Sequence, residues 1–454
     1  MLTLALLGLA HGRPDGGTGL YTFDDTDVVV SMDSPAATVR VWYSVDGPNV
    51  VDLDDADADG VPDFAAEVAV TAEHVLEVYA AAGFRAPLSD GVRGGSDAMD
   101  VYLVDFAGNA DGMYAAESCS SRPTQCSGYF VMENDFAGYG YADLASAIRV
   151  LTSHELFHAV QAAYDAEEEI WFSEGTAVWA ENLYDPGNAD FLRFCSAYLD
   201  DPGRSLDEPP SGPVPTFAYA TGLWWWFLSN RYGDDMLVAL LESTEASDTL
   251  LADMAVLQEE RGGALAEDFA TFARWNLATG AYAGAAESYP FAAELGAPRA
   301  EDDGAHIDDD NRFYPLATTY YRLEHPGGEV WFAAEADAPE LAFSLHATTP
   351  EGDVRDALTT FAGAVTPLSL GELDAGDYWL VGSNPTLAEE STKVRVCLGS
   401  AADVAACAPT ADPAEDTAGA ADTSAGCGCA TTTGTVPGAL LTAGMLLGAR
   451  RRRG

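Results

Sequence analysis

Residues 151–184 constrain the fold of this chain more strongly than any other stretch. Within them, His154 and His158 are four positions apart, and Glu155 directly follows the first histidine. On an α-helix, side chains four positions apart lie on one face, one turn from each other, so the two imidazoles can hold one metal ion. Glu155 lies about 100° further round the same helix, where its carboxylate can accept a proton from water beside the metal. The spacing therefore predicts a helix that carries a metal site.

A metal site of this catalytic kind needs a third protein ligand and one open position. Glu174 is the best candidate, sixteen residues after His158. We expect the first helix to end near Tyr164 and a second helix to begin near Ser173, which is a suitable N-cap residue. Two helices joined by a short loop pack antiparallel, so Glu174 can face the histidines. Glu181, seven residues further along the same helix face, is the alternative ligand.

The amino-acid sequence of these two helices is similar to that of a known family. Residues 154–158 read H-E-L-F-H, and residues 171–177 read W-F-S-E-G-T-A. Together they resemble the gluzincin zinc peptidases, which bind zinc through two histidines and a glutamate on the next helix. The resemblance implies an α+β fold, with a zincin-like catalytic domain made of a mixed sheet and active-site helices. It implies that His154, His158 and Glu174 bind Zn²⁺ and that Glu155 is the general base. The spacing is a few residues shorter than in the best-known gluzincins, which leaves Glu181 as a fallback ligand or a residue that supports one.

The resemblance also implies how a protein or peptide substrate is held. In gluzincins, the last strand before the active-site helix is an edge strand that pairs with extended substrate. Residues 128–132 are expected to form that strand, which assigns substrate binding to Tyr129, Phe130 and Val131 through backbone pairing at a sheet edge. The aminopeptidase string G-x-M-E-N is absent, although residues 132–134 read M-E-N, so we favour an endopeptidase.

Peptide hydrolysis places negative charge on the attacked carbonyl oxygen, and a phenol can stabilise it. Tyr219, at the start of the strongly apolar stretch 217–228, is our candidate for this role. The alternative is a buried tyrosine whose hydroxyl is satisfied within the core.

An acidic stretch nearer the N-terminus predicts a second metal site. Carboxylates at alternate positions precede Gly60 and resemble the start of a calcium-binding EF-hand loop; the four are Asp55, Asp57, Asp59 and Asp63. The twelfth loop position holds Ala66 where a bidentate glutamate belongs. We expect Ca²⁺ to brace this loop, and a solvated acidic turn is the alternative.

The charge of the chain excludes some partners. The formal net charge is −52, from 21 Lys and Arg against 73 Asp and Glu. A surface this acidic repels nucleic acid and anionic lipid. We therefore expect no nucleic-acid partner and no membrane contact except through the C-terminal tail. We also expect a monomer.

Changes in composition divide the chain into segments. Residues 1–10 are apolar and end in small residues, as in a secretory signal peptide; a buried N-terminal strand is the alternative. Residues 11–300 are expected to form the catalytic domain. The two-residue alternation from about 312 to 400 predicts short strands and resembles the β-sandwich modules of secreted proteases. Residues 401–426 are assigned to a disordered linker, since 408–426 hold no large apolar residue.

The seven cysteines fit an exported protein. We expect two disulfides, Cys119–Cys126 and Cys397–Cys407, with Cys195 unpaired. Residues 427–454 combine Cys427 and Cys429 with a weakly apolar span and terminal arginines, which resembles the myxobacterial C-terminal sorting tail. This resemblance implies a secreted protein retained at the cell surface. A simple tail anchor is the alternative for this segment.

One alternative function comes from another class. A catalytically inactive surface adhesion or scaffold protein could keep the zincin fold as a relic. The calcium-like loop, the sandwich and the tail would all suit it. The presence of all three ligands and the base favours the peptidase.

Overall fold

The computed structural model describes residues 12–17, 21–207, 216–247, 249–284, 287–336, 341–348, 354–356, 361–362, 366–387 and 390–408. All of them belong to one compact unit, Met1–Pro409. The predicted signal peptide, residues 409–426 of the predicted linker, and the tail with Cys427 and Cys429 lie outside these residues. In the part that the structure describes, no helix is both long enough and apolar enough to span a membrane. The expected mixture of helices with a mixed sheet is confirmed.

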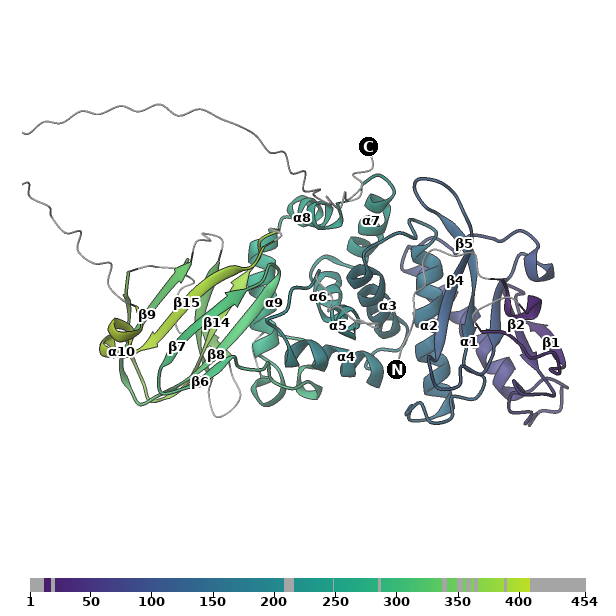
Figure 1. Cartoon of the computed structure of the whole chain (residues 1–454), viewed down its shortest axis with the longest axis horizontal. Coiled ribbons are helices and arrows are strands. Elements are labelled where there is room, and N and C mark those ends of the chain that lie inside the picture. The colour runs from purple at the N-terminus through teal and green to yellow at the C-terminus, as the bar shows by residue number, and fades with distance from the viewer. Residues whose placement is uncertain are drawn as a thin grey trace, which may run out of the picture. The chain divides into compact units, whose positions relative to one another are not determined.

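The N-terminal part is built on a five-stranded sheet with the order β1-β2-β3-β5-β4 (Figure 1). Its strands are β1 (Val29–Asp33), β2 (Val39–Ser44), β3 (Met99–Leu103), β4 (Gly112–Cys119) and β5 (Cys126–Met132). Strands β2, β3 and β5 run parallel, and β1 and β4 run antiparallel to their neighbours. Two helices, α1 (Asp63–Ala81) and α2 (Leu144–Gln161), pack on one face around Val41, Val101 and Phe130.

The predicted role of β5 as a substrate-binding edge strand is wrong. β5 lies inside the sheet, because it pairs with β3 on one side and with β4 on the other. Its backbone groups are already bonded, so Tyr129, Phe130 and Val131 cannot pair with a substrate strand. The edge is β4, which has one partner among the described strands. No strand is predicted there from the sequence, because the glycine and alanines of β4 have low strand propensity.

The opposite face of this sheet is covered by the N-terminal segment. Tyr21 and Phe23 pack against Tyr102 and the neighbouring apolar side chains of β3, β4 and β5. Arg13 lies beside them, with its guanidinium carbon 5.6 Å from the centre of the Tyr129 ring. The guanidinium forms ion pairs with three buried carboxylates, those of Asp90, Asp100 and Glu117. This cluster ties the start of the described chain to the sheet.

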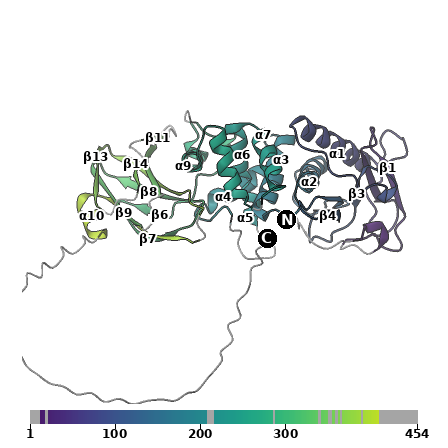
Figure 2. The same ribbon diagram turned by 90° about the horizontal axis from the view of Figure 1, so that it is seen from above.

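Seven further α-helices lie between α2 and the C-terminal strands in the described chain: α3 (Ile170–Tyr184), α4 (Ala189–Asp200), α5 (Thr216–Ala220), α6 (Gly222–Tyr232), α7 (Asp235–Thr244), α8 (Leu250–Glu260) and α9 (Leu265–Leu277). Helix α3 packs against α2, α5 and α6 (Figure 2). It begins at Ile170 with Glu169 as N-cap, so Ser173 is not the N-cap residue. The earlier start places the fully buried Trp171 and Phe172 in the helix, where both rings contact Trp225 of α6.

The C-terminal part consists of two further sheets. One has the order β11-β10-β14-β8-β6, with β12 also on β10, and the other has the order β13-β9-β15-β7. Phe343 of the first sheet packs against Phe313 and Phe332 of the second, with ring centroids 5.7 and 5.2 Å apart. The two sheets therefore share one core. Their strands are β6 (Asp302–Gly304), β7 (Ile307–Phe313), β8 (Ala317–His325), β9 (Gly328–Ala336), β10 (Ala342–Thr348), β11 (Val354–Asp356), β12 (Phe361–Ala362), β13 (Leu368–Leu373), β14 (Gly376–Asn384) and β15 (Thr392–Gly399).

Two boundaries differ from the sequence analysis. The strands begin at Asp302 rather than near 312. A short helix, α10 (Ala401–Cys407), occupies a stretch assigned to the disordered linker. Ser400 and Asp403 form a capping box at its start, and the disulfide Cys397–Cys407 joins it to β15. Local capping and a covalent bond thus order residues whose small side chains alone indicated no structure.

Candidate metal centre

Helix α2 presents the two histidines from a position inside the protein. Asp143 is its N-cap, because its carboxylate accepts a hydrogen bond from the backbone N–H of Ser146 at 2.7 Å. The helix is buried on nearly every side from residue 147 onward, since it lies between the sheet and α3. Its polar residues are buried with the rest: His154, Glu155 and His158 are at most 5 % exposed. Buried groups of this kind require partners.

Helix α3 brings the predicted third ligand to the histidines. The Oε2 atom of Glu174 lies 3.3 Å from His154 Nε2 and 3.4 Å from His158 Nε2. One ligand atom from each of the three residues fits within 4.8 Å of the other two, a grouping that could hold a metal ion. Glu181 lies elsewhere, with Oε1 2.7 Å from His154 Nδ1. Of the two candidate third ligands, Glu174 is therefore the one that faces both Nε2 atoms.

The glycine after Glu174 has a packing role. A Cβ atom on Gly175 would lie 2.1 Å from Thr221 Oγ1 and 2.6 Å from Trp225 Nε1. Only a residue without a side chain lets α3 approach α6 this closely. The close approach also allows the Thr221 hydroxyl to donate to the carbonyl of Trp171 at 2.8 Å. The two adjacent residues thus have different roles: Glu174 is the candidate ligand, and Gly175 allows α3 to pack closely on α6.

Each histidine has a partner on its other ring nitrogen. Glu181 contacts Nδ1 of His154, and Gln161 Oε1 lies 2.7 Å from Nδ1 of His158. With Nδ1 of each ring directed to one of these acceptors, Nε2 is the nitrogen left to bind a metal. The Gln161 amide also donates to Ser173 O at 2.7 Å and to Thr176 Oγ1 at 2.8 Å. Gln161 thereby links one histidine to the helix that carries the third ligand.

Sequence reasoning did not assign Gln161. The signal was present, because residues three positions apart on a helix are neighbours, and a glutamine three after the second histidine is placed to contact it. Sequence reasoning also missed Gly112 on β4. A Cβ atom there would lie 2.7 Å from Glu155 Oε1 and 2.6 Å from Leu151 Cδ1. No local pattern could have found this contact, since Gly112 and Glu155 meet only when the sheet packs on α2.

The electrostatics of the three glutamates differ although all are buried. Burial raises the pKa of Glu155 to about 7, and neither of its carboxylate oxygens has a hydrogen-bond partner. Burial also raises the pKa of Glu181, to about 8. Burial acts in the same direction on Glu174, but the charge of His158 and the hydrogen bond with His154 outweigh it and lower the pKa to about 2. Glu174 is thus the carboxylate held ionised at the ring nitrogens.

Tyr219 is a residue of α5, and its ring lies beside the candidate metal centre. Its ring stacks on that of His154, with centroids 5.7 Å apart and an interplanar angle of 17°. The other side of its ring stacks on Phe194 at 5.0 Å. The structure therefore brings Tyr219 to the metal centre, whereas Tyr129, Phe130 and Val131 are inner positions of the sheet.

The acidic loop before α1 forms a second group of carboxylates. Asp55, Asp57 and Asp63 each offer one oxygen within 4.8 Å of the others, and such a group could hold a cation. Asp59 is outside this group of three; its Oδ1 accepts the backbone N–H of Val61 at 2.8 Å. Three of the four predicted residues thus come together.

Comparison with known proteins adds no family to this picture. No protein-family model matches the chain, and no curated protein matches it in sequence.

Proposed function

We propose that the chain is a zinc-dependent peptidase with a zincin-like catalytic domain at residues 11–300. One observation carries the proposal. Two ligand atoms about 2.0–2.1 Å from a tetrahedral zinc are about 3.3–3.4 Å apart. The Nε2–Oε2 separations of 3.3 and 3.4 Å at His154, His158 and Glu174 agree with this value. Both separations lie beyond the usual range of about 2.7–3.2 Å for N–H···O hydrogen bonds, and His158 Nε2 forms no hydrogen bond. Two imidazoles and one carboxylate are the donor set of many catalytic zinc sites.

When bound, zinc supplies Lewis-acid chemistry: it lowers the pKa of water and polarises a carbonyl group. Glu155 supplies proton transfer. Its two carboxylate oxygens are free of hydrogen bonds and its pKa is raised to about 7 by burial. A carboxylate of this kind can accept a proton from the attacking water near neutral pH and return it to the leaving amine. Glu174 and Glu155 therefore differ in role: Glu174 is ionised, whereas Glu155 can exchange a proton.

The edge strand supports a peptide as the substrate. Because β4 has one partner among the described strands, the backbone groups on its other side are placed to pair with an extended chain. Gly112 begins this strand directly against Glu155, so a peptide paired with β4 would pass the general base. Tyr219 is our candidate for the residue that stabilises the carbonyl oxygen, since its ring lies on His154. Substrate binding thus moves from β5, where the sequence placed it, to β4.

The test combines metal content with hydrolysis. Purified full-length protein is analysed for zinc and assayed on casein, with and without a chelator. We expect one zinc per chain and chelator-sensitive cleavage. Glu155→Gln should retain zinc and lose cleavage, because glutamine cannot exchange the proton. Glu259→Gln, an exposed position on α8, is the matched control and should behave as wild type. Zinc binding without cleavage of any protein substrate would favour the scaffold alternative.

We propose that the protein is exported, because it contains two disulfides and disulfides persist in oxidising compartments. Retention at the cell surface rests on residues 427–454, outside the described part of the chain.

We also propose Ca²⁺ at Asp55, Asp57 and Asp63. Millimolar calcium should raise the melting temperature of the wild type and leave that of Asp57→Asn unchanged. An equal rise in both would contradict the calcium site.

A further inference from the structure

The loop between α2 and α3 decides where Glu174 lies relative to the histidines. Helix α2 ends at Gln161 and α3 begins at Ile170, so residues 162–169 join the two ligand-bearing helices. Zinc–ligand distances in proteins vary by only about 0.2 Å. A small displacement of this loop would therefore move Glu174 out of reach of a metal bound to His154 and His158.

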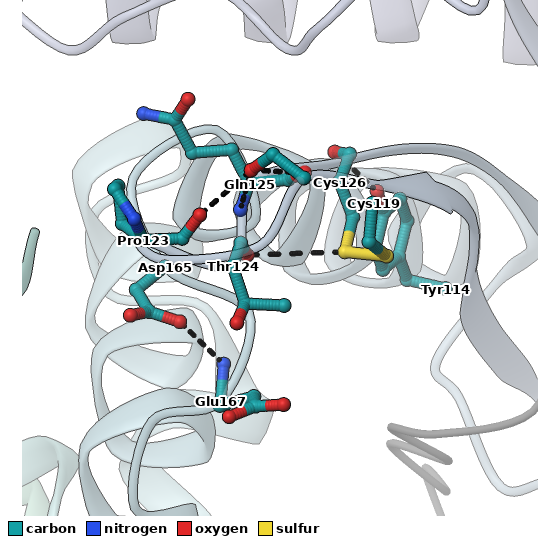
Figure 3. Close-up of a disulfide and its surroundings, with 9 residues drawn as sticks. Tyr114, Cys119, Pro123, Thr124, Gln125, Cys126, Asp165 and Glu167 are labelled. Carbon is teal, nitrogen blue, oxygen red and sulfur yellow. Dashed lines mark hydrogen bonds between the residues drawn. A yellow bond between two sulfur atoms is a disulfide. The ribbon is translucent and has the colours of Figure 1, made fainter. Parts of the chain in front are cut away.

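The turn of the β4–β5 hairpin holds this loop at two points. The backbone N–H of Cys126 donates to the carbonyl of Ala162 at 2.8 Å. The backbone N–H of Ala166 donates to the carbonyl of Thr124 at 2.8 Å. Figure 3 shows the turn, with Thr124 lying beside Asp165 and above Glu167 of the loop. The hairpin thus fixes the first half of the α2–α3 connection, at residues 162 and 166.

The disulfide Cys119–Cys126 closes the base of this turn, next to the hydrogen bond from the backbone N–H of Ser120 to the carbonyl of Gln125. The two cysteines face each other across the hairpin as a pair of the β4–β5 ladder. The ladder is irregular between Ala116 and Ser118, immediately before the disulfide. Edge strands with a bulge pair weakly at that point. The covalent bond therefore closes a turn that backbone pairing alone holds less firmly, and Cys126 is itself one of the two contacts to the loop.

We propose that Cys119 and Cys126 are positioning residues of the metal centre, and that opening their disulfide weakens metal binding by releasing the α2–α3 loop. This inference rests on the proposed zinc site. The chain offers a matched control, because Cys397–Cys407 joins β15 to α10 in the C-terminal sheets. The two disulfides differ in accessibility: Cys119 is exposed and its partner Cys126 is buried, whereas Cys397 and Cys407 are both buried.

The first experiment compares two double variants of the full-length protein, Cys119→Ser with Cys126→Ser, and Cys397→Ser with Cys407→Ser. The zinc dissociation constant is measured by competition with a chromophoric chelator. We expect the hairpin variant to bind zinc about tenfold more weakly, or worse, as when partners around metal ligands are removed. We expect the control variant to stay within about twofold of wild type. The Co²⁺-substituted protein gives a second readout, since loss of the third ligand changes its visible spectrum.

Reduction of folded wild-type protein covers the case in which the hairpin variant does not fold. A water-soluble phosphine breaks the S–S bond and gives two thiols; the phosphine is oxidised to its oxide, with oxygen from water. The thiols are then alkylated, and mass spectrometry identifies Cys119 and Cys126 as the modified pair. Weaker zinc binding in this form supports the proposal. Binding unchanged from wild type in either form overturns it while leaving the zinc site intact, whereas failure of wild-type protein to bind zinc overturns the proposed function instead.

Discussion

Glu155→Gln should change how the stability of the metal-free protein depends on pH. Glu155 is fully buried without a hydrogen-bond partner, and burial raises its pKa from 4.5 to about 7. Between pH 4.5 and about pH 7, the Glu155 carboxyl group is protonated in the folded protein and ionised in the unfolded chain. The free energy of unfolding therefore falls as pH rises through this window. The stabilisation by the neutral carboxyl group is complete below pH 4.5 and is lost above pH 7.

The size of the effect follows from the same two values. The interval from 4.5 to about 7 corresponds to about 3 kcal/mol, at about 1.4 kcal/mol per pH unit. Glutamine cannot ionise, so its contribution is constant. The free energy of unfolding of wild type minus that of Glu155→Gln should therefore decrease by about 3 kcal/mol between pH 4.5 and pH 8. Taking this difference removes the contributions of the titrating groups that do not interact with Glu155.

The assay is urea unfolding in the presence of a chelator, followed by tryptophan fluorescence at several pH values. Zinc offers an internal check, because a nearby cation favours the ionised carboxylate. Saturating zinc should therefore shrink the pH-dependent difference. A difference between wild type and variant that is constant from pH 4.5 to 8 in metal-free protein would refute the buried, raised-pKa description of Glu155.

Three further substitutions test the packing around the site. Gly112→Ala should lower the free energy of unfolding by about 1–3 kcal/mol, because its Cβ would lie 2.7 Å from Glu155 Oε1; unchanged stability in urea would mean that β4 does not press on α2. Gln161→Leu should raise the zinc dissociation constant at least about tenfold, since Nδ1 of His158 loses its acceptor; chelator competition checks this, and wild-type affinity would contradict it. Arg13→Met should cost about 3–5 kcal/mol by leaving three buried carboxylates without their cation; a urea midpoint equal to wild type would exclude a structural role for the cluster.

The local parts of the metal centre could be predicted from the sequence. The i, i+4 spacing of His154 and His158 fixes their relation on any helix, and Asp143 caps that helix through a bond to a residue three positions away. The disulfide Cys119–Cys126 was predicted for the same reason, because few residues separate its cysteines. These features depend on short segments of chain, whose geometry is nearly the same in every fold.

The order of the strands in the sheet could not be predicted from the sequence. β4 and β5 are adjacent in the sequence, and nothing local states which of them also pairs with β3. The structure places β5 inside and β4 at the edge, which moves the expected substrate contact away from Tyr129. The start of α3 was misplaced for a related reason: Ser173 is a good N-cap by type, but burial of Trp171 and Phe172 extends the helix to Ile170.

The sequence by itself determined the pairing of His154 with His158 on one helix face, the position of Glu155 beside them, and the mixture of helices and strands, because these follow from residue types at fixed short spacings. Only the tertiary structure decided between Glu174 and Glu181, placed Gly112 against Glu155, and joined the hairpin turn to the α2–α3 loop. Each of these depends on segments distant in sequence meeting in the core, and their relative position is set by the packing of whole helices and sheets.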